Sequence, residues 1–181
     1  AISNDGAVGF TTVVTGNGKG FYVSQNNAIS PQAVPGQVAP DSGGGVVDNL
    51  GDLMADRYAM TDQHSVAFYT TLAGGTMNVG IFRTSAGALA SVALIGQAAS
   101  GLAPGTTFVD FDQVFVNNAG AVAFSCLLKS GTGTKQSVVL SANKKFQLIA
   151  TEQQLAPGAG GSRFSSFELR DLWINDGGDV A

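Results

Sequence analysis

The chain has 181 residues, of which 44% are hydrophobic and only 12% are charged, well below the roughly 25% of charged residues typical of soluble domains. This composition excludes a disordered chain, which would carry more charge and fewer aromatic residues. The net charge is −4 and the nine Lys and Arg are scattered, which excludes a nucleic-acid-binding protein with a basic patch, and no apolar run is long enough for a transmembrane helix.

The length fits a single domain over residues 1–181, and the 25 glycines favour an all-β domain of short strands joined by tight turns. Low charge with many Gly, Ser, Thr and Asn residues favours an extracellular or cell-surface location. The single Cys126 lies in an alternating run, so we predict a small buried residue and not a reactive thiol. Because Ala1 stands inside a repeat without a signal peptide, we expect a mature form or a fragment.

A turn-forming segment recurs four times along the chain. It predicts the end of one strand, a tight turn and the start of the next strand. The four copies are Ile2–Phe10, Met60–Phe68, Val116–Phe124 and Ile174–Ala181. Their turn positions are Gly6, His64, Gly120 and Gly178, which follow one another at intervals of 58, 56 and 58 residues.

Two further landmarks recur in the same order and at a similar period. The first is a glutamine, at Gln37, Gln97 and Gln154. The second is a spaced apolar pair, at Val47 and Leu50, at Phe108 and Phe111, and at Phe164 and Phe167. Three landmarks at one period predict repeats over residues 1–52, 53–111 and 112–169, with the opening of a fourth repeat over 170–181.

Four strands are predicted in each repeat. The first strand is short, at Tyr58–Met60, Val114–Val116 and Leu172–Ile174. The second strand has large side chains on one face, at Val8, Phe10, Thr12 and Val14, at Val66, Phe68, Thr70 and Leu72, and at Val122, Phe124, Cys126 and Leu128. Its other face begins with a small residue, at Gly9, Ala67 and Ala123. This period of two predicts a sheet that is packed on both faces, with close approach on the small side.

The third and fourth strands complete the unit. The third is predicted at Phe21–Val23, Gly80–Arg83 and Val138–Leu140, and the fourth at Ile29–Val34, Leu89–Ile95 and Phe146–Ala150. Glycine-rich loops precede the third strand, at Gly16–Gly20, Gly74–Gly75 and Gly131–Gly133. We expect the longer segment with the glutamine and the apolar pair to be an ordered loop that leads into the next repeat.

The chemistry of the recurring turn follows from its residues. Gly6, Gly120 and Gly178 are predicted to have positive φ, which is free of strain without a Cβ. Asn117 and Asn175 stand before the glycine and can accept hydrogen bonds from nearby backbone amides. The remaining turn position holds the only histidine, which tolerates positive φ better than most residues. These residues therefore predict structural turns.

Four short antiparallel strands in a unit of about 57 residues predict a β-propeller-like fold with three blades and the start of a fourth; known blade repeats run to roughly 40–50 residues. A β-sandwich built from hairpins is the main alternative. It would not require three landmarks at one period.

The repeat resembles the NxxGxxAF tandem-repeat family of secreted bacterial proteins. The third copy matches in full, at Asn117, Gly120, Ala123 and Phe124, whereas the first and second copies each depart at two positions. The family carries varied C-terminal surface anchors, and the resemblance implies export, a surface location and no catalytic residues. No such anchor stands in this sequence.

No metal, cofactor or catalytic residue is predicted. The oxygen-rich segment Asn175–Asp179 lacks the spacing of a calcium loop and is interpreted as a turn. A glycosidase would need two carboxylates at a set separation, and nothing marks a pair among Asp48, Asp110, Glu168 and Asp171. A secreted hydrolase is therefore the least favoured hypothesis.

The two ends of the chain carry the functional hypothesis. Leu172, Trp173 and Ile174 supply a first strand of the kind that Ala1 and Ile2 form only in part. Three blades do not close a propeller, so unpaired edges would invite another chain. We therefore predict a non-enzymatic, self-associating extracellular structural protein, a ring or filament subunit whose complementary ends pair by strand addition with other copies of itself. The alternative is a secreted module that binds glycans or another ligand.

Overall fold

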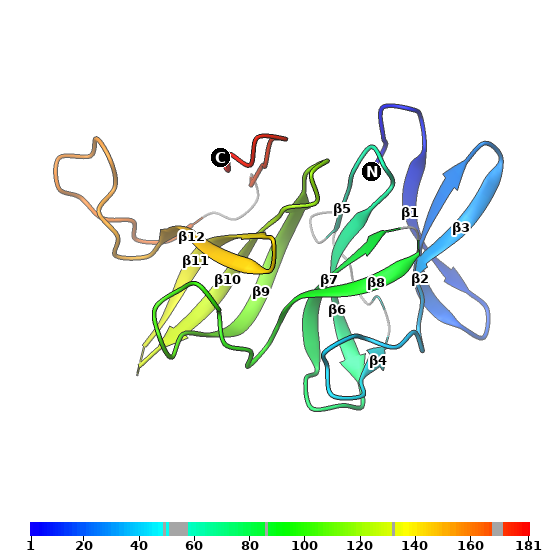
Figure 1. Ribbon diagram of the computed structural model, residues 1–181, viewed down its shortest axis with the longest axis horizontal. Coiled ribbons are helices and arrows are strands. Elements are labelled where there is room, and N and C mark those ends of the chain that lie inside the picture. Colours follow the sequence, from blue (N-terminus) through cyan, green and yellow to red (C-terminus); the bar gives the residue numbers. More distant parts are fainter. Residues whose placement is uncertain (49, 51–57, 86, 132, 168–171) are drawn as a thin grey trace.

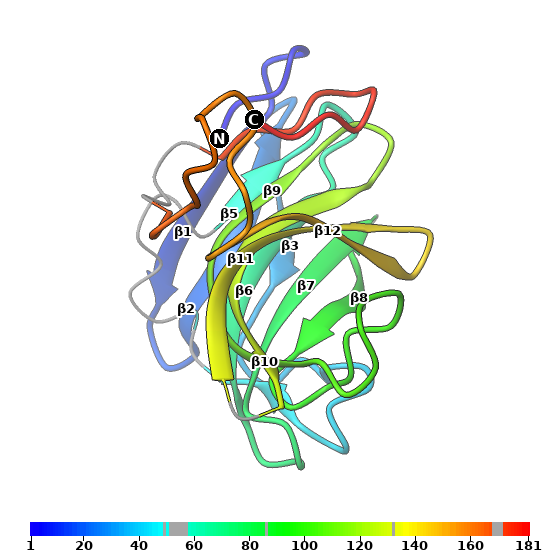
Figure 2. The ribbon, with the colours of Figure 1, turned by 90° about the vertical axis from the view of Figure 1, so that its left-hand side faces the viewer.

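The computed structural model describes residues 1–48, 50, 58–85, 87–131, 133–167 and 172–181. Within these residues the chain is all-β and has no helix, and its strands form three antiparallel sheets (Figure 1). The sheets follow one another along the long axis of the molecule in chain order, and they are visibly twisted and curled (Figure 2). The prediction of an all-β chain of short antiparallel strands is confirmed.

The strand bounds show how the three sheets correspond. The first sheet contains β1 (Val8–Val14), β2 (Gly18–Gln25) and β3 (Ala28–Ala33). The second contains β4 (Val46–Val47), β5 (Tyr58–Met60), β6 (Val66–Ala73), β7 (Val79–Ser85) and β8 (Ala88–Leu94). The third contains β9 (Thr107–Val116), β10 (Val122–Ser130), β11 (Gly133–Ala142) and β12 (Lys145–Thr151).

One pairing scheme underlies the second and third sheets. In the third sheet β9 pairs with β10 from Thr107 opposite Lys129 to Val116 opposite Val122. In the second sheet the same edge is made by two strands, because β4 and β5 pair with opposite ends of β6. The strands β1, β6 and β10 therefore hold equivalent places, each followed by two further antiparallel strands.

The sheets are joined by apolar cores between their facing sides. Phe68 and Leu72 of β6 pack in one core with Phe21 of the first sheet, whereas Ala67 of the same strand lies in another core with Phe124 of the third sheet. Large side chains thus face the preceding sheet and small ones face the following sheet. This packing confirms the two-faced pattern predicted for β6, whereas the prediction is wrong for β1, where Val8 and Val14 of the large-residue face are exposed.

Three residues of the apolar pairs lie in strands and not in loops, which corrects one prediction, whereas Leu50 and the third pair, Phe164 and Phe167, lie outside the named strands as expected. Phe108 and Phe111 belong to β9 and Val47 belongs to β4, and all three are buried. The backbones of Phe108 and Phe111 pair with β10, and the backbone of Val47 pairs with β6. Pairing with these neighbouring strands makes the residues part of a strand.

Two smaller corrections concern the expected strands and loops. Gly18–Gly20 lies in β2 and Gly133 begins β11, so these glycines extend strands that were expected to begin later. Leu172–Ile174 forms only an isolated bridge, between Ile174 and Val180. The predicted repeat boundaries at residues 52–53 and 169–170 lie outside the described residues.

The glutamine landmark has a structural reason that the sequence did not reveal. Each glutamine side chain accepts a hydrogen bond from the amide three residues before it, where the last strand of the repeat ends. The donors and distances are Val34 N to Gln37 Oε1 at 3.3 Å, Leu94 N to Gln97 Oε1 at 3.0 Å and Thr151 N to Gln154 Oε1 at 3.1 Å. The glutamine therefore stabilises the exit from each sheet.

Candidate functional site

The four recurring turns share one backbone geometry. In each turn the amide at the glycine position donates to the carbonyl three residues before it. The pairs are Gly6 N to Ser3 O at 3.1 Å, His64 N to Thr61 O at 3.0 Å, Gly120 N to Asn117 O at 2.9 Å and Gly178 N to Asn175 O at 3.0 Å. The φ angles are 83°, 61°, 80° and 89° for Gly6, His64, Gly120 and Gly178. We call residues 3–7, 61–65, 117–121 and 175–179 together the turn rim.

The first residue of every turn also caps it with a side-chain oxygen. The bonds are Ala7 N to Ser3 Oγ at 3.0 Å, Ser65 N to Thr61 Oγ1 at 3.0 Å, Ala121 N to Asn117 Oδ1 at 2.8 Å and Asp179 N to Asn175 Oδ1 at 2.8 Å. Ser3 and Thr61 thus take the role of asparagine in the two copies that lack it at the first motif position. A hydroxyl on Cβ makes the same local bond.

The second residues of the four turns form a hydrogen-bonded row, which we call the polar ladder. Its members are Asn4, Asp62, Asn118 and Asp176. The amide of each of the first three donates to Oδ1 of the next member, from Asn4 N at 2.9 Å, from Asp62 N at 2.8 Å and from Asn118 N at 2.9 Å. These bonds connect residues of successive repeats, so the turns stand in register along one edge of the molecule.

His64 connects two neighbouring turns of the rim. Its Nε2 lies 3.1 Å from both carboxylate oxygens of Asp5. The hydrogen bond from the Ser3 hydroxyl and then the bond with His64 lower the pKa of the Asp5 carboxyl to about 2. Asp5 is therefore ionised at neutral pH and holds a partner on each side.

Replacing His64 with glycine is expected to leave the free energy of unfolding within about 1 kcal/mol of the wild type. Glycine removes the strain of a left-handed backbone, about 1 kcal/mol, and the pair that is lost with Asp5 is exposed to solvent and therefore weak. His64→Ala keeps a Cβ at φ 61° and loses the pair, so it should be the less stable of the two variants. Urea denaturation of both measures the difference; a glycine variant less stable than the alanine variant would contradict the turn role.

An apolar surface lies on the outer side of the first sheet, and we call it the open face. It is formed by Val8, Phe10, Val14, Tyr22 and Ile29, which the strand pairing places on one side of the sheet. Val8 is 41% exposed and Ile29 is 65% exposed, and the rings of Phe10 and Tyr22 stack at 6.1 Å. The first sheet is therefore not packed on both faces by the described residues, unlike the second.

The residues predicted to mediate self-association are paired within their own hairpins. Ala1 exchanges backbone bonds with Gly9, at 2.8 and 3.0 Å, and Ile2 bridges to Val8. At the other end Trp173 exchanges bonds with Ala181, at 2.8 and 3.0 Å. The backbone groups of Ala1 and Trp173 that form these bonds are thus already paired within their own chain.

The side chains of these residues differ in exposure. Ile2 is 74% exposed and Trp173 is 68% exposed, and the Trp173 ring stacks on Phe115 at 6.2 Å. Leu172 is buried and Ile174 packs beside it, in the core on the far side of the third sheet. Ile2 and Trp173 therefore offer apolar surface, whereas Leu172 holds the C-terminal hairpin to the third sheet.

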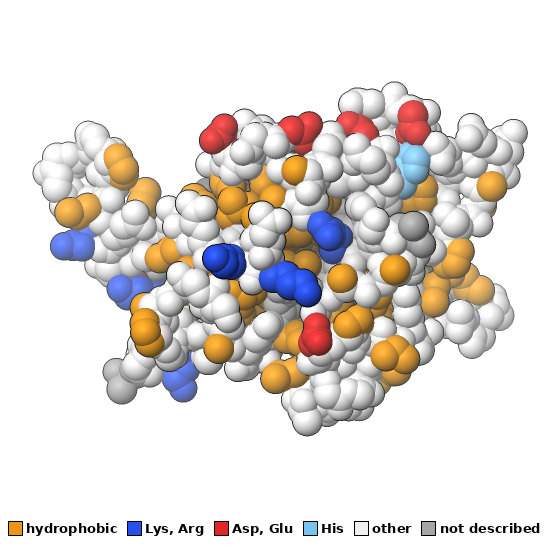
Figure 3. Space-filling view, in the orientation of Figure 1, with side chains coloured by type: hydrophobic (Ala, Val, Ile, Leu, Met, Phe, Trp, Pro, Cys, Tyr) orange, Lys and Arg blue, Asp and Glu red, His pale blue; other side chains and the backbone are white. Residues whose placement is uncertain are grey.

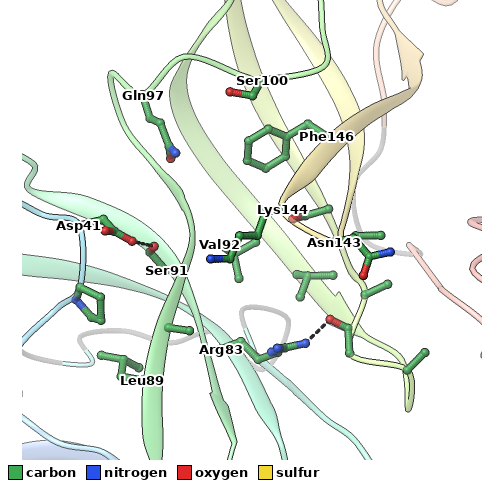
Figure 4. A pocket seen from close by; sticks show the side chains of 18 residues that line it. Asp41, Arg83, Leu89, Ser91, Val92, Gln97, Ser100, Asn143, Lys144 and Phe146 are labelled. Carbon is green, nitrogen blue, oxygen red and sulfur yellow. Dashed lines mark hydrogen bonds between the residues drawn. The ribbon is translucent and has the colours of Figure 1, made fainter.

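A groove of about 680 Å³ opens between β8 and the turn that joins β11 to β12 (Figure 4). Arg83 and Lys144 stand on its two walls, and Arg83 donates to the carbonyl of Gly120. Asp41 accepts from the Ser91 hydroxyl at the other end. Figure 3 shows basic side chains gathered toward the middle of this face and acidic ones along the edge of the turn rim. The groove was not predicted from the sequence.

The described residues hold no group of three His, Cys, Asp or Glu side chains that could bind a metal ion. Cys126 is buried, and burial raises the pKa of its thiol. Asp48 and Asp110 are exposed, whereas Glu168 and Asp171 lie outside the described residues. In that part of the chain there is also no helix long and apolar enough to cross a membrane.

Comparisons with known proteins give one match. The model of a family of unknown function, DUF7453, matches residues 1–181. No curated protein and no solved structure matches the chain.

Proposed function

The chain belongs to DUF7453, a family of unknown function, and from its geometry we propose that it is a non-enzymatic, extracellular structural protein that self-associates. Its sheets serve as propeller-like blades, three of them complete enough to pack on one another, with the hairpin at residues 172–181 as the start of a fourth. The repeated pairing scheme and the apolar cores between successive sheets support this architecture.

The open face is the observation that carries the proposal. Val8 and Phe10 of β1 hold the positions that Val66 and Phe68 hold in β6, where both side chains are fully buried against the preceding sheet. Removing a large apolar side chain from water contributes about 1.5–3 kcal/mol. A surface with this composition and this equivalence is therefore suited to a sheet of the same kind.

The partner that fits the open face is the C-terminal side of a second copy. Within the molecule each large-residue face packs on the side of the preceding sheet that carries small residues. The C-terminal hairpin follows the third sheet in the same order, and it presents the exposed ring of Trp173. Such a contact joins different surfaces of the two copies, so it generates a closed ring or a filament.

The experiment is the oligomeric state of charge variants, measured by sedimentation velocity over a range of concentrations. The wild type should form species larger than 18.3 kDa. The double variant Val8→Lys/Ile29→Lys should associate at least ~100-fold more weakly, because unpaired ammonium groups would be buried in the contact. The matched control is Val13→Lys, which lies on the same strand but on its other face, and it should behave as the wild type.

Two results would contradict the proposal. One is a folded wild type that stays monomeric at about 100 μM, well above the range of a stable interface. The other is association that survives the double variant, which would move the contact away from the open face. Circular dichroism of each variant establishes that it is folded.

A ligand-binding module is the second candidate function, and the groove favours it. Arg83 and Lys144 give this part of an acidic protein a local positive charge suited to an acidic carbohydrate. A folded monomer in the sedimentation experiment would favour this function over self-association.

A further inference from the structure

The polar ladder follows one chemical rule along its length. Besides the bonds from the backbone amides, an asparagine Nδ2 group donates to the aspartate Oδ2 of its neighbour in every step. The distances are 2.8 Å from Asn4 to Asp62, 2.9 Å from Asn118 to Asp62 and 3.0 Å from Asn118 to Asp176. Two hydrogen bonds of the polar ladder therefore join each pair of neighbouring turns.

This rule requires asparagine and aspartate to alternate. An ionised carboxylate only accepts, so two neighbouring aspartates would place oxygen against oxygen. If two asparagines were neighbours, the hydrogen bond from the backbone amide of one to Oδ1 of the other would fix their orientation. The Nδ2 donor of one would then face the Nδ2 donor of the other. The order Asn4, Asp62, Asn118, Asp176 avoids both arrangements at every step.

The two outer members have hydrogen-bonding groups left over. Among the described residues nothing donates to Asn4 Oδ1 and nothing accepts from the amide of Asp176. Asp176 Oδ2 receives one donor, from Asn118, whereas Asp62 Oδ2 receives two. Both outer residues are exposed on the turn rim.

The leftover groups fit each other. Asp176 offers an amide donor and a carboxylate acceptor, and Asn4 offers an amide oxygen and a second Nδ2 hydrogen. We infer that the polar ladder continues from one copy of the chain to the next, with Asp176 of the first copy bonded to Asn4 of the second. This inference rests on the proposed self-association, and it names the contact that sets the register of the assembly.

The contact repeats a step that the structure already contains. The amide of Asp62 donates to Asn118 Oδ1 and Asn118 Nδ2 donates back to Asp62 Oδ2. Asp176 and the incoming Asn4 have the same residue types in the same order. Asn4 also lies two residues from Ile2 and four from Val8, so the ladder and the open face would engage the same neighbour.

The sharpest test inverts the ladder. The variant Asn4→Asp/Asp62→Asn/Asn118→Asp/Asp176→Asn keeps the alternation inside the chain and between identical copies, and it should associate as the wild type does. When the two proteins are mixed, Asp176 of the wild type meets the new carboxylate at position 4. Resonance energy transfer between labelled copies should then show mixed contacts at least about tenfold weaker than like contacts.

A matched pair of single variants keeps the test decisive if the inverted chain does not fold. Asp176→Asn should weaken association about tenfold or more, because it puts an amide where the neighbouring asparagine needs an acceptor. Asp179→Asn makes the same change of charge in the same turn but outside the ladder, so it should leave association unchanged.

The outcomes separate the ladder from the self-association on which it depends. Free mixing of wild type and inverted chains, or equal weakening by the two single variants, overturns the ladder contact while self-association stands. A wild type that never associates overturns the self-association itself and, with it, the ladder contact.

Discussion

Replacing Phe124 with alanine is expected to lower the free energy of unfolding by about 3–5 kcal/mol. The side chain is fully buried, and its ring packs against Phe108 at 5.8 Å, Phe111 at 5.8 Å and Phe146 at 6.2 Å. These rings come from β9, β10 and the start of β12, so they cannot close the cavity without moving three strands. Since small domains are stable by about 5–15 kcal/mol, the variant should be close to unfolding.

The control for this prediction is the same residue type at the equivalent repeat position. Phe10 stands on the open face and is only half-buried, so Phe10→Ala should cost no more than about 1.5 kcal/mol in the monomer. Urea titration below the concentration of association compares the two. Equal losses would mean that the first and third sheets are packed alike, contrary to the structure.

Gly75→Ala is expected to lower the free energy of unfolding by about 2–5 kcal/mol, the second large effect. The loop between β6 and β7 lies against residues 42–45, where Thr76 N and Met77 N donate to the carbonyl of Ser42 at 3.0 and 3.1 Å. A Cβ on Gly75 would lie 2.5 Å from the Gly45 amide nitrogen and 2.7 Å from the Ser42 oxygen. Both are backbone atoms, so overlap of about 1–3 kcal/mol adds to about 1–2 kcal/mol for positive φ.

The neighbouring glycine provides the control. Gly74 has φ 69° against 72° for Gly75, but a Cβ there would meet nothing within 4 Å. Gly74→Ala should therefore cost only the conformational part, about 1–2 kcal/mol. The difference between the two variants in thermal or urea unfolding isolates the close approach of the two loops. A difference near zero would show that the loops are not in contact in solution.

The sequence predicted the hairpins well because their signals are local. Tyr58–Met60 is β5 as expected, and alternation located the start of β6 and β10 at Val66 and Val122. The first part of the edge strand β9 was not predicted. Residues 101–105 hold two glycines and a proline, which reads as a loop, and only pairing with the distant end of β10 makes a strand of Thr107–Phe111.

Two parts of the candidate site also escaped prediction. The groove joins Arg83 with Lys144, which are brought together only when the second and third sheets are adjacent. The polar ladder had a signal, since Asn4, Asp62, Asn118 and Asp176 alternate at the repeat period. The signal lies at the position that follows the first motif residue, which the motif leaves unspecified. Its meaning depends on turns from different repeats lying side by side.

Because asparagine and aspartate alternate along the polar ladder, the number of repeats that can be added without disturbing it must be even. Inserting a single extra unit between the second and third repeats would place two like members next to each other and break one step. Inserting two units, with asparagine and then aspartate at the ladder position, would keep the alternation at every step. Lengthening of this architecture, whether by gene duplication or by an engineer, should therefore succeed in even steps and fail in odd ones.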